Sequence, residues 1–323
     1  MICKQFRVLV AAVLAALIYA PSGFALINGQ ENSKMKGVIQ LSGFCTGIAV
    51  GLNPLTVITA RHCASKGSIQ LPLKDSEGGL AEPEQVLFAY FYENGFDSDV
   101  SIVPGDIAVL IFSPSVSKKF TFHWLKNRFK NAIKSSDLFS VAPVPIRWGD
   151  PVSVCGFGTD FYRGCGSNYL LTDNSDFAFA DISEQINEKY PKATTLMDIP
   201  DTDKIALVHS HIQYFLSQYG AGTRIGIGSF KSEALNSGFE SGFDHDNQSV
   251  IPEPGDSGGP WYVIRDGVPH LIGVTSLSVR EDRLRVGGIA WRIDHPWTVK
   301  LLQEAAKRGA DIRGLEELKQ LQQ

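Results

Sequence analysis

Three short segments of the sequence carry the residue types needed for catalysis by a serine hydroxyl. They are residues 59–63 (Thr-Ala-Arg-His-Cys), Asp106 directly before the apolar run 107–112, and residues 255–260 (Gly-Asp-Ser-Gly-Gly-Pro). A serine hydroxyl is a weak nucleophile at neutral pH, so it needs an adjacent base that takes its proton. That base needs a carboxylate that fixes its tautomer and stabilises its charge. The three segments together supply a hydroxyl, an imidazole and a carboxylate.

The glycine-rich segment on its own also fits another class of enzyme. Gly-x-Ser-x-Gly is the nucleophile elbow of α/β-hydrolases, a fold that places its histidine after the serine. Only His270 and His295 follow the serine here, and neither explains the segment at His62. Asp97 and Asp99 are further candidates for the carboxylate. Asp106 is favoured because it stands at the mouth of a predicted strand.

The elements that must position these residues are mostly predicted strands. Short apolar runs of 4–8 residues alternate with turn residues over 26–112, resume at 151–158, and continue through 271–276 and 288–293. Apolar residues in the stretch 181–220 recur at helical spacing instead. At the other end of the chain, Asp294 is predicted to be the N-cap of a helix that starts at Pro296.

These segments and their order resemble those of trypsin/chymotrypsin-like serine proteases, over Leu26 to about Leu302. The resemblance implies an all-β fold of two six-stranded antiparallel β-barrels with a C-terminal helix and a helical insertion in the second barrel. The expected organisation is a signal peptide at 1–25, a first barrel at 26–130, a second barrel at 131–300 with its insertion at about 181–220, and a helical tail at 301–323.

The resemblance also implies a role for each site residue. Ser257 would be the nucleophile, His62 the general base and then acid, and Asp106 the carboxylate that orients His62. The backbone N–H groups of Gly255 and Ser257 would form the oxyanion hole. Glycine fits at 255 because its N–H must face the cleft, which a side chain could prevent. Ser276 would begin the strand, continuing through Leu277 and Ser278, that pairs with an extended substrate.

The residue six positions before the nucleophile lies at the base of the specificity pocket in this family. Here it is Ile251, which cannot pair with a cationic side chain. Ser278 and Gly288 would line the pocket walls. The expected preference before the scissile bond is therefore for a small or medium uncharged residue.

The N-terminus is typical of a secretory signal peptide. Lys4 and Arg7 precede an apolar run over 8–20, which is shorter than the ~20 residues of a membrane helix, and small residues precede a cut after Ala25. The protein is therefore expected to be secreted or periplasmic. In the family, the freed N-terminal ammonium pairs with the aspartate before the nucleophile. We hypothesise that signal peptidase makes this activating cut, so that Leu26 pairs with Asp256.

Four cysteines remain after the signal peptide: Cys45, Cys63, Cys155 and Cys165. Two disulfides are expected in an exported protein, and the count alone leaves three pairings open. The family resemblance implies a Cys45–Cys63 bond behind the histidine. Cys155–Cys165 is then the remaining pair, with two free thiols as the alternative.

The expected partners are protein or peptide substrates. The net charge of −4 gives no basic surface for nucleic acid, and no stable membrane association is expected after signal cleavage. The chain is expected to be a monomer without cofactor or metal. His209 and His211 would face different sides of a helix, and Asp244, Asp246 and Asn247 lack the later acidic ligand of a calcium loop. The alternatives to a protease are a catalytically silent binding module of this fold and a secreted esterase that uses the same triad.

Overall fold

The structure, a computed structural model, describes most of the expected barrel segments. The predicted signal peptide lies outside the described residues, and so does nearly all of the predicted helical insertion. The described residues are 26–27, 29–42, 45–65, 70–72, 80–93, 101–117, 133–147, 150–158, 163–171, 188–192, 200, 224–228, 250–281 and 284–320.

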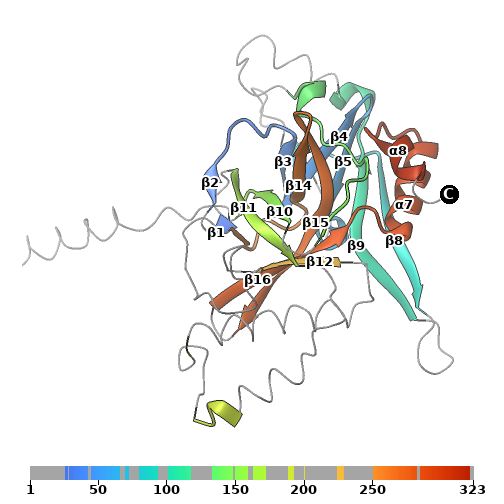
Figure 1. The fold of residues 1–323 in the computed structure, drawn as a ribbon. Helices are drawn as coiled ribbons and strands as arrows, with labels where there is room; N and C mark the ends of the chain where they lie inside the picture. The colour runs from blue at the N-terminus through green and yellow to red at the C-terminus, as the bar shows by residue number, and fades with distance from the viewer. Residues whose placement is uncertain are drawn as a thin grey trace, which may run out of the picture.

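The first half of the chain forms a five-stranded antiparallel sheet in the order β3-β4-β5-β9-β8 (Figure 1). All residues of β4 and β5 are buried, as expected for adjoining strands in the middle of a barrel wall. A two-stranded piece, β6–β7, lies beside this sheet. The bounds are β3 (Val38–Leu41), β4 (Cys45–Leu52), β5 (Leu55–Thr59), α2 (Arg61–Ser65), β6 (Leu71–Pro72), β7 (Leu80–Ala81), β8 (Gln85–Glu93) and β9 (Ser101–Ile111).

The second half forms a seven-stranded sheet in the order β10-β14-β15-β16-β12-β11-β2, closed by a further β10–β11 pairing. The pairing of β10 with both of its neighbours closes this sheet into a barrel. A two-residue turn, Asp266-Gly267, joins β14 to β15 with both residues at positive φ, which fits the right-handed twist of a hairpin. The bounds are η2 (Ser135–Asp137), β10 (Pro151–Gly156), β11 (Gly164–Leu171), β12 (Arg224–Gly228), β13 (Ile251–Pro252), β14 (Pro260–Arg265), β15 (Val268–Glu281) and β16 (Leu284–Arg292).

The first residues of the described chain pair with strands from the second half of the chain and not with the first sheet. Strand β1 (Leu26–Ile27) pairs with β13 in a separate two-stranded sheet, and β2 (Gln30–Glu31) pairs with β11 at the edge of the seven-stranded sheet. The described strands therefore number five in the first sheet and seven in the second. The start of the chain consequently contributes to the half that carries the nucleophile segment.

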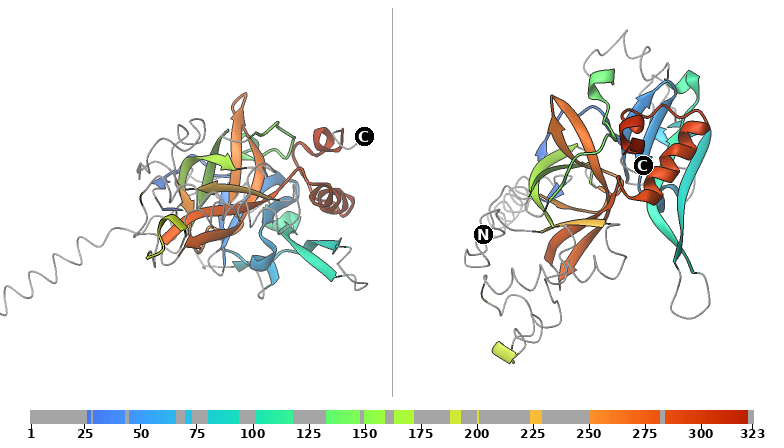
Figure 2. Two further views of the ribbon diagram at one scale, coloured as in Figure 1. Left: turned by 60° about the horizontal axis from the view of Figure 1, so that its bottom comes forward. Right: turned by 45° about the vertical axis from the view of Figure 1, so that its right-hand side comes forward.

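Two helices, α7 (Pro296–Lys307) and α8 (Leu315–Gln320), follow the last strand. The prediction that Asp294 caps α7 is wrong. His295 is the N-cap, because its Nδ1 accepts the Trp297 N–H, whereas both carboxylate oxygens of Asp294 accept hydrogen bonds from Arg292. Helix α7 lies against β8 and β9 on the outside of the first sheet (Figure 2).

A connecting segment, residues 309–314, returns from α7 across the first sheet. The carboxylate of Asp311 accepts the backbone N–H groups of Leu52 and Asn53, at 2.8 and 3.0 Å. Arg313 donates its N–H to Val50 and accepts the N–H of Val141. This segment therefore joins the β4–β5 hairpin to the chain that links the two sheets.

One apolar core runs through both sheets. It includes Ile48 and Val109 from the first sheet and Val274 and Trp291 from the second. Phe139, between the sheets, packs edge to face on Tyr262 with ring centroids 5.2 Å apart. The prediction of an all-β fold with two antiparallel barrel-like units and a C-terminal helix is confirmed. No helix among the described residues is long and apolar enough to cross a membrane.

Candidate active site

His62 lies in α2, a single helical turn that begins two residues after β5 ends. Its ring nitrogen Nδ1 is 3.0 and 2.9 Å from the two carboxylate oxygens of Asp106, and its backbone N–H donates to the same carboxylate at 3.0 Å. A carboxylate accepts hydrogen bonds only, so Nδ1 is the protonated ring nitrogen. The other nitrogen, Nε2, is then an acceptor. The sequence placed His62 and Asp106 in one site, and the structure brings them together.

Asp106 is held from two directions. It lies in β9, and its side chain is 18% exposed. In addition to His62, the hydroxyl of Ser276 donates to its Oδ2 at 2.5 Å. Ser276 is the extra residue of a β-bulge between Thr275 and Leu277 in β15, and bulges often redirect a side chain beside a site. Asp97 and Asp99, the alternative carboxylates, lie outside the described residues.

The environment of Asp106 keeps its carboxyl group ionised. Burial by itself would raise the pKa, but the hydrogen bond and charge of His62, the hydroxyl of Ser276 and the backbone N–H of His62 outweigh it. The net result is a pKa below the ordinary value of 3.8. At neutral pH the carboxylate of Asp106 therefore carries a negative charge next to the protonated Nδ1 of His62.

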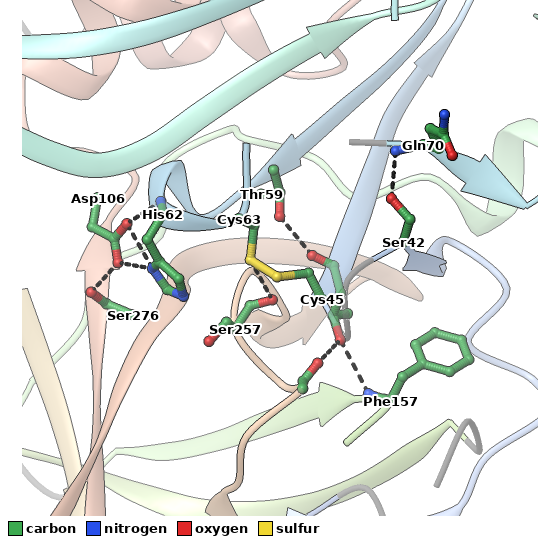
Figure 3. The surroundings of a disulfide bond; sticks show 12 residues. Ser42, Cys45, Thr59, His62, Cys63, Gln70, Asp106, Phe157, Ser257 and Ser276 are labelled. Atoms are coloured by element: carbon green, nitrogen blue, oxygen red, sulfur yellow. Dashed lines mark hydrogen bonds and ion pairs between the residues drawn. A yellow bond between two sulfur atoms is a disulfide. The ribbon is translucent and has the colours of Figure 1, made fainter. Parts of the chain in front are cut away.

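Ser257 lies in the loop between β13 and β14, next to the disulfide between Cys45 and Cys63 (Figure 3). Its carbonyl oxygen accepts the N–H of Thr46 at 2.8 Å and lies 3.6 Å from the sulfur of Cys63, the residue after His62. The partly exposed side chain of Ser257 extends toward the ring of His62 (Figure 3). The imidazole, the carboxylate and the hydroxyl thus converge from three distant segments of the chain.

Two backbone N–H groups beside Ser257 are available for a ligand. Among the described residues, the N–H groups of Gly255 and Ser257 donate no hydrogen bond to the protein. The N–H groups of Asp256, Gly258 and Gly259 are all used, in bonds to Glu253, Thr275 and Asp256 respectively. The two free donors are those that the sequence assigned to an oxyanion hole.

Glycine is required at two positions of this loop. Gly255 has φ +102°, and a β carbon there would lie 2.1 Å from the carbonyl oxygen of Gly158. Gly258 has φ +85°, and a β carbon there would lie 2.1 Å from the hydroxyl of Thr59. Both values of φ are in the region that side chains rarely adopt. The loop conformation that leaves the two N–H groups free therefore depends on these glycines.

Asp256, the predicted partner of the freed N-terminus, has a fully buried side chain. Its carboxylate accepts the N–H of Gly158 at 2.8 Å and the N–H of Glu253 at 2.7 Å. Leu26 is also fully buried and pairs with Pro252, four residues before Asp256. Both members of the predicted pair are therefore buried, and Leu26 is paired with β13, the strand that precedes Asp256 in the chain.

The described residues contain two disulfides, the Cys45–Cys63 bond that the family resemblance implied and the remaining pair, Cys155–Cys165. Cys45 of β4 is bonded to Cys63 of α2, directly beside His62. Cys155 and Cys165 face each other across the β10–β11 pair and are bonded. The first bond attaches the histidine segment to β4, an interior strand of its sheet.

The residues predicted to form the specificity pocket lie on adjoining strands. Ile251 is 3% exposed and pairs with Ile27. Ser278 pairs with Gly288 across β15 and β16, and both Leu277 and Ser278 are partly exposed. A β carbon on Gly288 would lie 2.7 Å from the ring of Pro252, so β13 packs closely on this wall.

Sequence reasoning did not identify two polar contributors to the site. Ser276 was expected to pair with substrate through its backbone, and its hydroxyl on Asp106 was not foreseen because a bulge has no sequence signal here. The sequence suggested no role at the site for Thr46, although its hydroxyl donates to the backbone of the nucleophile loop. Its only signal is its place directly after Cys45.

Several expectations concern residues that the structure does not describe. The stretch 181–220 is described only at 188–192 and 200, so its helical character stays a prediction. His209, His211, Asp244, Asp246 and Asn247 all lie outside the described residues. The proposed monomeric state is likewise a prediction that a single chain does not test.

The sequence also matches the model of a known protein family. The family model for Trypsin matches residues 27–195, slightly more than half of the chain. This range includes His62 and Asp106 and ends before Ser257. No curated protein matches the chain.

Proposed function

Because the chain belongs to the trypsin family of serine-type peptidases, we propose that it is a secreted endopeptidase that cleaves through an acyl-enzyme on Ser257. The observation that carries the proposal is the ionised Asp106 bonded to Nδ1 of His62. It leaves Nε2 as an acceptor on the side toward which the Ser257 hydroxyl extends. The pair of disulfides and the predicted signal peptide support secretion.

In the first half of the reaction, Ser257 Oγ attacks the carbonyl carbon of the scissile peptide bond. Its proton passes to Nε2 of His62, and the resulting imidazolium is stabilised by Asp106. The negative charge that develops on the carbonyl oxygen is bound by the N–H groups of Gly255 and Ser257. The imidazolium then donates its proton to the leaving amine, the C–N bond breaks, and the acyl group remains on Ser257.

In the second half, water replaces the departed amine. His62 takes a proton from the water, the hydroxide attacks the acyl carbon, and the same two N–H groups stabilise the new oxyanion. The proton returns from His62 to Ser257 Oγ as the ester bond breaks. The products are a free carboxyl group, a free amine and the unmodified enzyme, so the cycle requires no cofactor.

The proposed substrate preference is an uncharged residue before the scissile bond. Ile251 is apolar and buried, so a lysine or arginine that entered this pocket would lose its hydration without gaining a counter-ion. The close contact between Pro252 and Gly288 leaves little room for a long side chain on that side of the proposed pocket. Small and medium apolar side chains fit this description best.

Cleavage-site profiling of the secreted protein with a peptide library tests this proposal. We expect cleavage after small or medium uncharged residues to exceed cleavage after lysine or arginine by about 10-fold or more. Dominant cleavage after basic residues would contradict the proposed pocket. Hydrolysis of small esters without any peptide cleavage would favour an esterase, and no turnover of either class would favour a silent binding module.

We also propose that removal of the signal peptide completes the site. Leu26 is buried and pairs with Pro252, four residues before the buried Asp256, so we expect an ammonium group freed at Leu26 to pair with that carboxylate. Such an ion pair would help to hold the loop that carries Gly255 and Ser257. N-terminal sequencing of the active secreted protein is expected to begin at Leu26. Any other start would contradict activation by signal peptidase and would leave the triad proposal unaffected.

A further inference from the structure

We infer that Thr46 is a positioning residue that sets the conformation of the oxyanion loop, defined here as residues 255–258. The inference rests on the proposed function, because it concerns the two N–H groups that would bind the oxyanion. Thr46 is fully buried in β4, an interior strand of the first sheet that lies between β3 and β5. It therefore acts on the oxyanion loop, which belongs to the second half of the chain, from the opposite half.

Four hydrogen bonds connect Thr46 to its surroundings, and two of them hold the oxyanion loop. Its hydroxyl donates to the carbonyl oxygen of Gly255 at 2.9 Å, and its backbone N–H donates to the carbonyl oxygen of Ser257 at 2.8 Å. The same hydroxyl accepts the N–H of Phe157 at 3.1 Å. The carbonyl oxygen of Thr46 accepts the hydroxyl of Thr59 at 2.7 Å. Every polar atom of Thr46 is thus used.

These bonds fix the orientation of the Gly255–Asp256 and Ser257–Gly258 peptide planes, which lie on either side of the Asp256–Ser257 peptide. In a planar trans peptide the N–H points opposite to the preceding C=O. With the Gly255 carbonyl held by Thr46, the N–H of Asp256 points away from Thr46, to Glu253. With the Ser257 carbonyl held by Thr46, the N–H of Gly258 is directed to Thr275. Because both flanking peptides are fixed, the intervening N–H of Ser257 keeps its orientation.

The hydroxyl of Thr46 also holds residues 157–158, which pack against the oxyanion loop. Phe157, which it holds, precedes Gly158, whose N–H bonds Asp256 and whose carbonyl oxygen lies against Gly255. Loss of the hydroxyl would leave the Phe157 N–H and the Gly255 carbonyl without this partner inside the protein. A rotated Gly255 peptide would regain a hydrogen bond, but it would also turn the loop away from the geometry that the oxyanion needs.

The test compares Thr46→Val, which is nearly isosteric but lacks the hydroxyl, with Thr46→Ser, which retains it. Thr56→Val is the matched control, because Thr56 is equally buried and its hydroxyl also makes two hydrogen bonds, far from the loop. Each protein is secreted from the full-length chain. The measurements are kcat and KM on a peptide identified by the library, thermal unfolding, and inhibition by a peptide aldehyde, whose adduct with serine carries an oxygen into the oxyanion hole.

For T46V we expect kcat to fall by about 100-fold, the usual effect of losing one oxyanion donor, with KM within about 2-fold of the wild-type value. Aldehyde affinity should fall by a similar factor, because the aldehyde adduct resembles the transition state. T46S should retain kcat within about 3-fold of wild type. T56V should lower the unfolding temperature while kcat stays within the same range as T46S.

Folded T46V with unchanged kcat and aldehyde affinity would overturn the inference, as would equal losses in T46V and T56V. If T46V does not accumulate as folded protein, Thr46→Ala removes the hydroxyl without adding a methyl group and is measured in the same way. Failure of the proposed function is distinguishable from these results. In that case the wild-type protein itself would cleave no peptide and bind no aldehyde.

Discussion

Replacement of Ser257 by alanine is expected to lower kcat for peptide hydrolysis by about 10⁶-fold. The acyl-enzyme cannot form without the Ser257 hydroxyl, because His62 only accepts and returns its proton and the two N–H groups only bind the oxyanion. A residual rate of about 10³–10⁴ over the uncatalysed reaction should remain, because the oxyanion donors and the binding strands are unaltered. Labelling with a serine-directed fluorophosphonate, followed by mass spectrometry, should locate the label on Ser257 and find none in Ser257→Ala.

The control for this substitution is Ser140→Ala. Ser140 is buried, and its hydroxyl accepts a backbone N–H from Ala142, away from the site. S140A should be labelled as fast as the wild type. Labelling that persists in S257A, or a wild-type protein that is never labelled, would refute the proposed nucleophile.

Replacement of Asp106 by asparagine is expected to lower kcat by about 10⁴-fold at neutral pH. The amide group is similar in shape to the carboxylate, so it can still occupy the position opposite His62 and Ser276. However, it can present an N–H to Nδ1, which moves the imidazole proton to Nε2. A protonated Nε2 cannot accept the proton of Ser257. Steady-state kinetics with the peptide used for the wild type gives the ratio directly.

The same variant should alter the pH dependence of stability. The pKa of Asp106 is lower in the folded protein than its ordinary value of 3.8, so the ionised form stabilises the fold above that pH. This contribution is lost as the pH falls through the lowered pKa. The difference in unfolding free energy between wild type and D106N should therefore be greatest near neutral pH and decrease in acid.

Asp311→Asn is the matched control for D106N. Asp311 is also partly buried, and its carboxylate accepts two backbone N–H groups from the β4–β5 hairpin. D311N should lower the unfolding free energy by about 1–3 kcal/mol and leave kcat within about 2-fold of wild type. If D106N were no slower than D311N, Asp106 would have no role in orienting His62.

Much of the fold and site could be predicted because local sequence carries the relevant signals. Short apolar runs between turn residues predicted the strands, and the segments at His62, Asp106 and Ser257 were short enough to be recognised without an alignment. The N-cap of α7, in contrast, was predicted wrongly from the local sequence. Asp294 is a good N-cap residue by type, but Arg292 two residues earlier binds both of its oxygens, and His295 takes the capping position.

The contacts of Ser276 and Thr46 could not be predicted for a different reason. Ser276 reaches Asp106 because a bulge shifts the register of β15, and Thr46 reaches Gly255 across 209 positions of the sequence. Both depend on how two sheets pack, and neither leaves a pattern in the residues nearby. Such cross-sheet hydrogen bonds become visible only once the tertiary structure is known.

The return of residues 309–314 to the β4–β5 hairpin bears on the order in which parts of the fold form during synthesis. The hydrogen bond from Leu52 to Asp311 joins residues 259 positions apart, so it forms only after both sheets have been translated. A nascent chain that has exposed only the histidine segment lacks this support as well as the serine. The proposed triad can therefore assemble only after Ser257 has been synthesised, and the support of the β4–β5 hairpin by Asp311 forms later still.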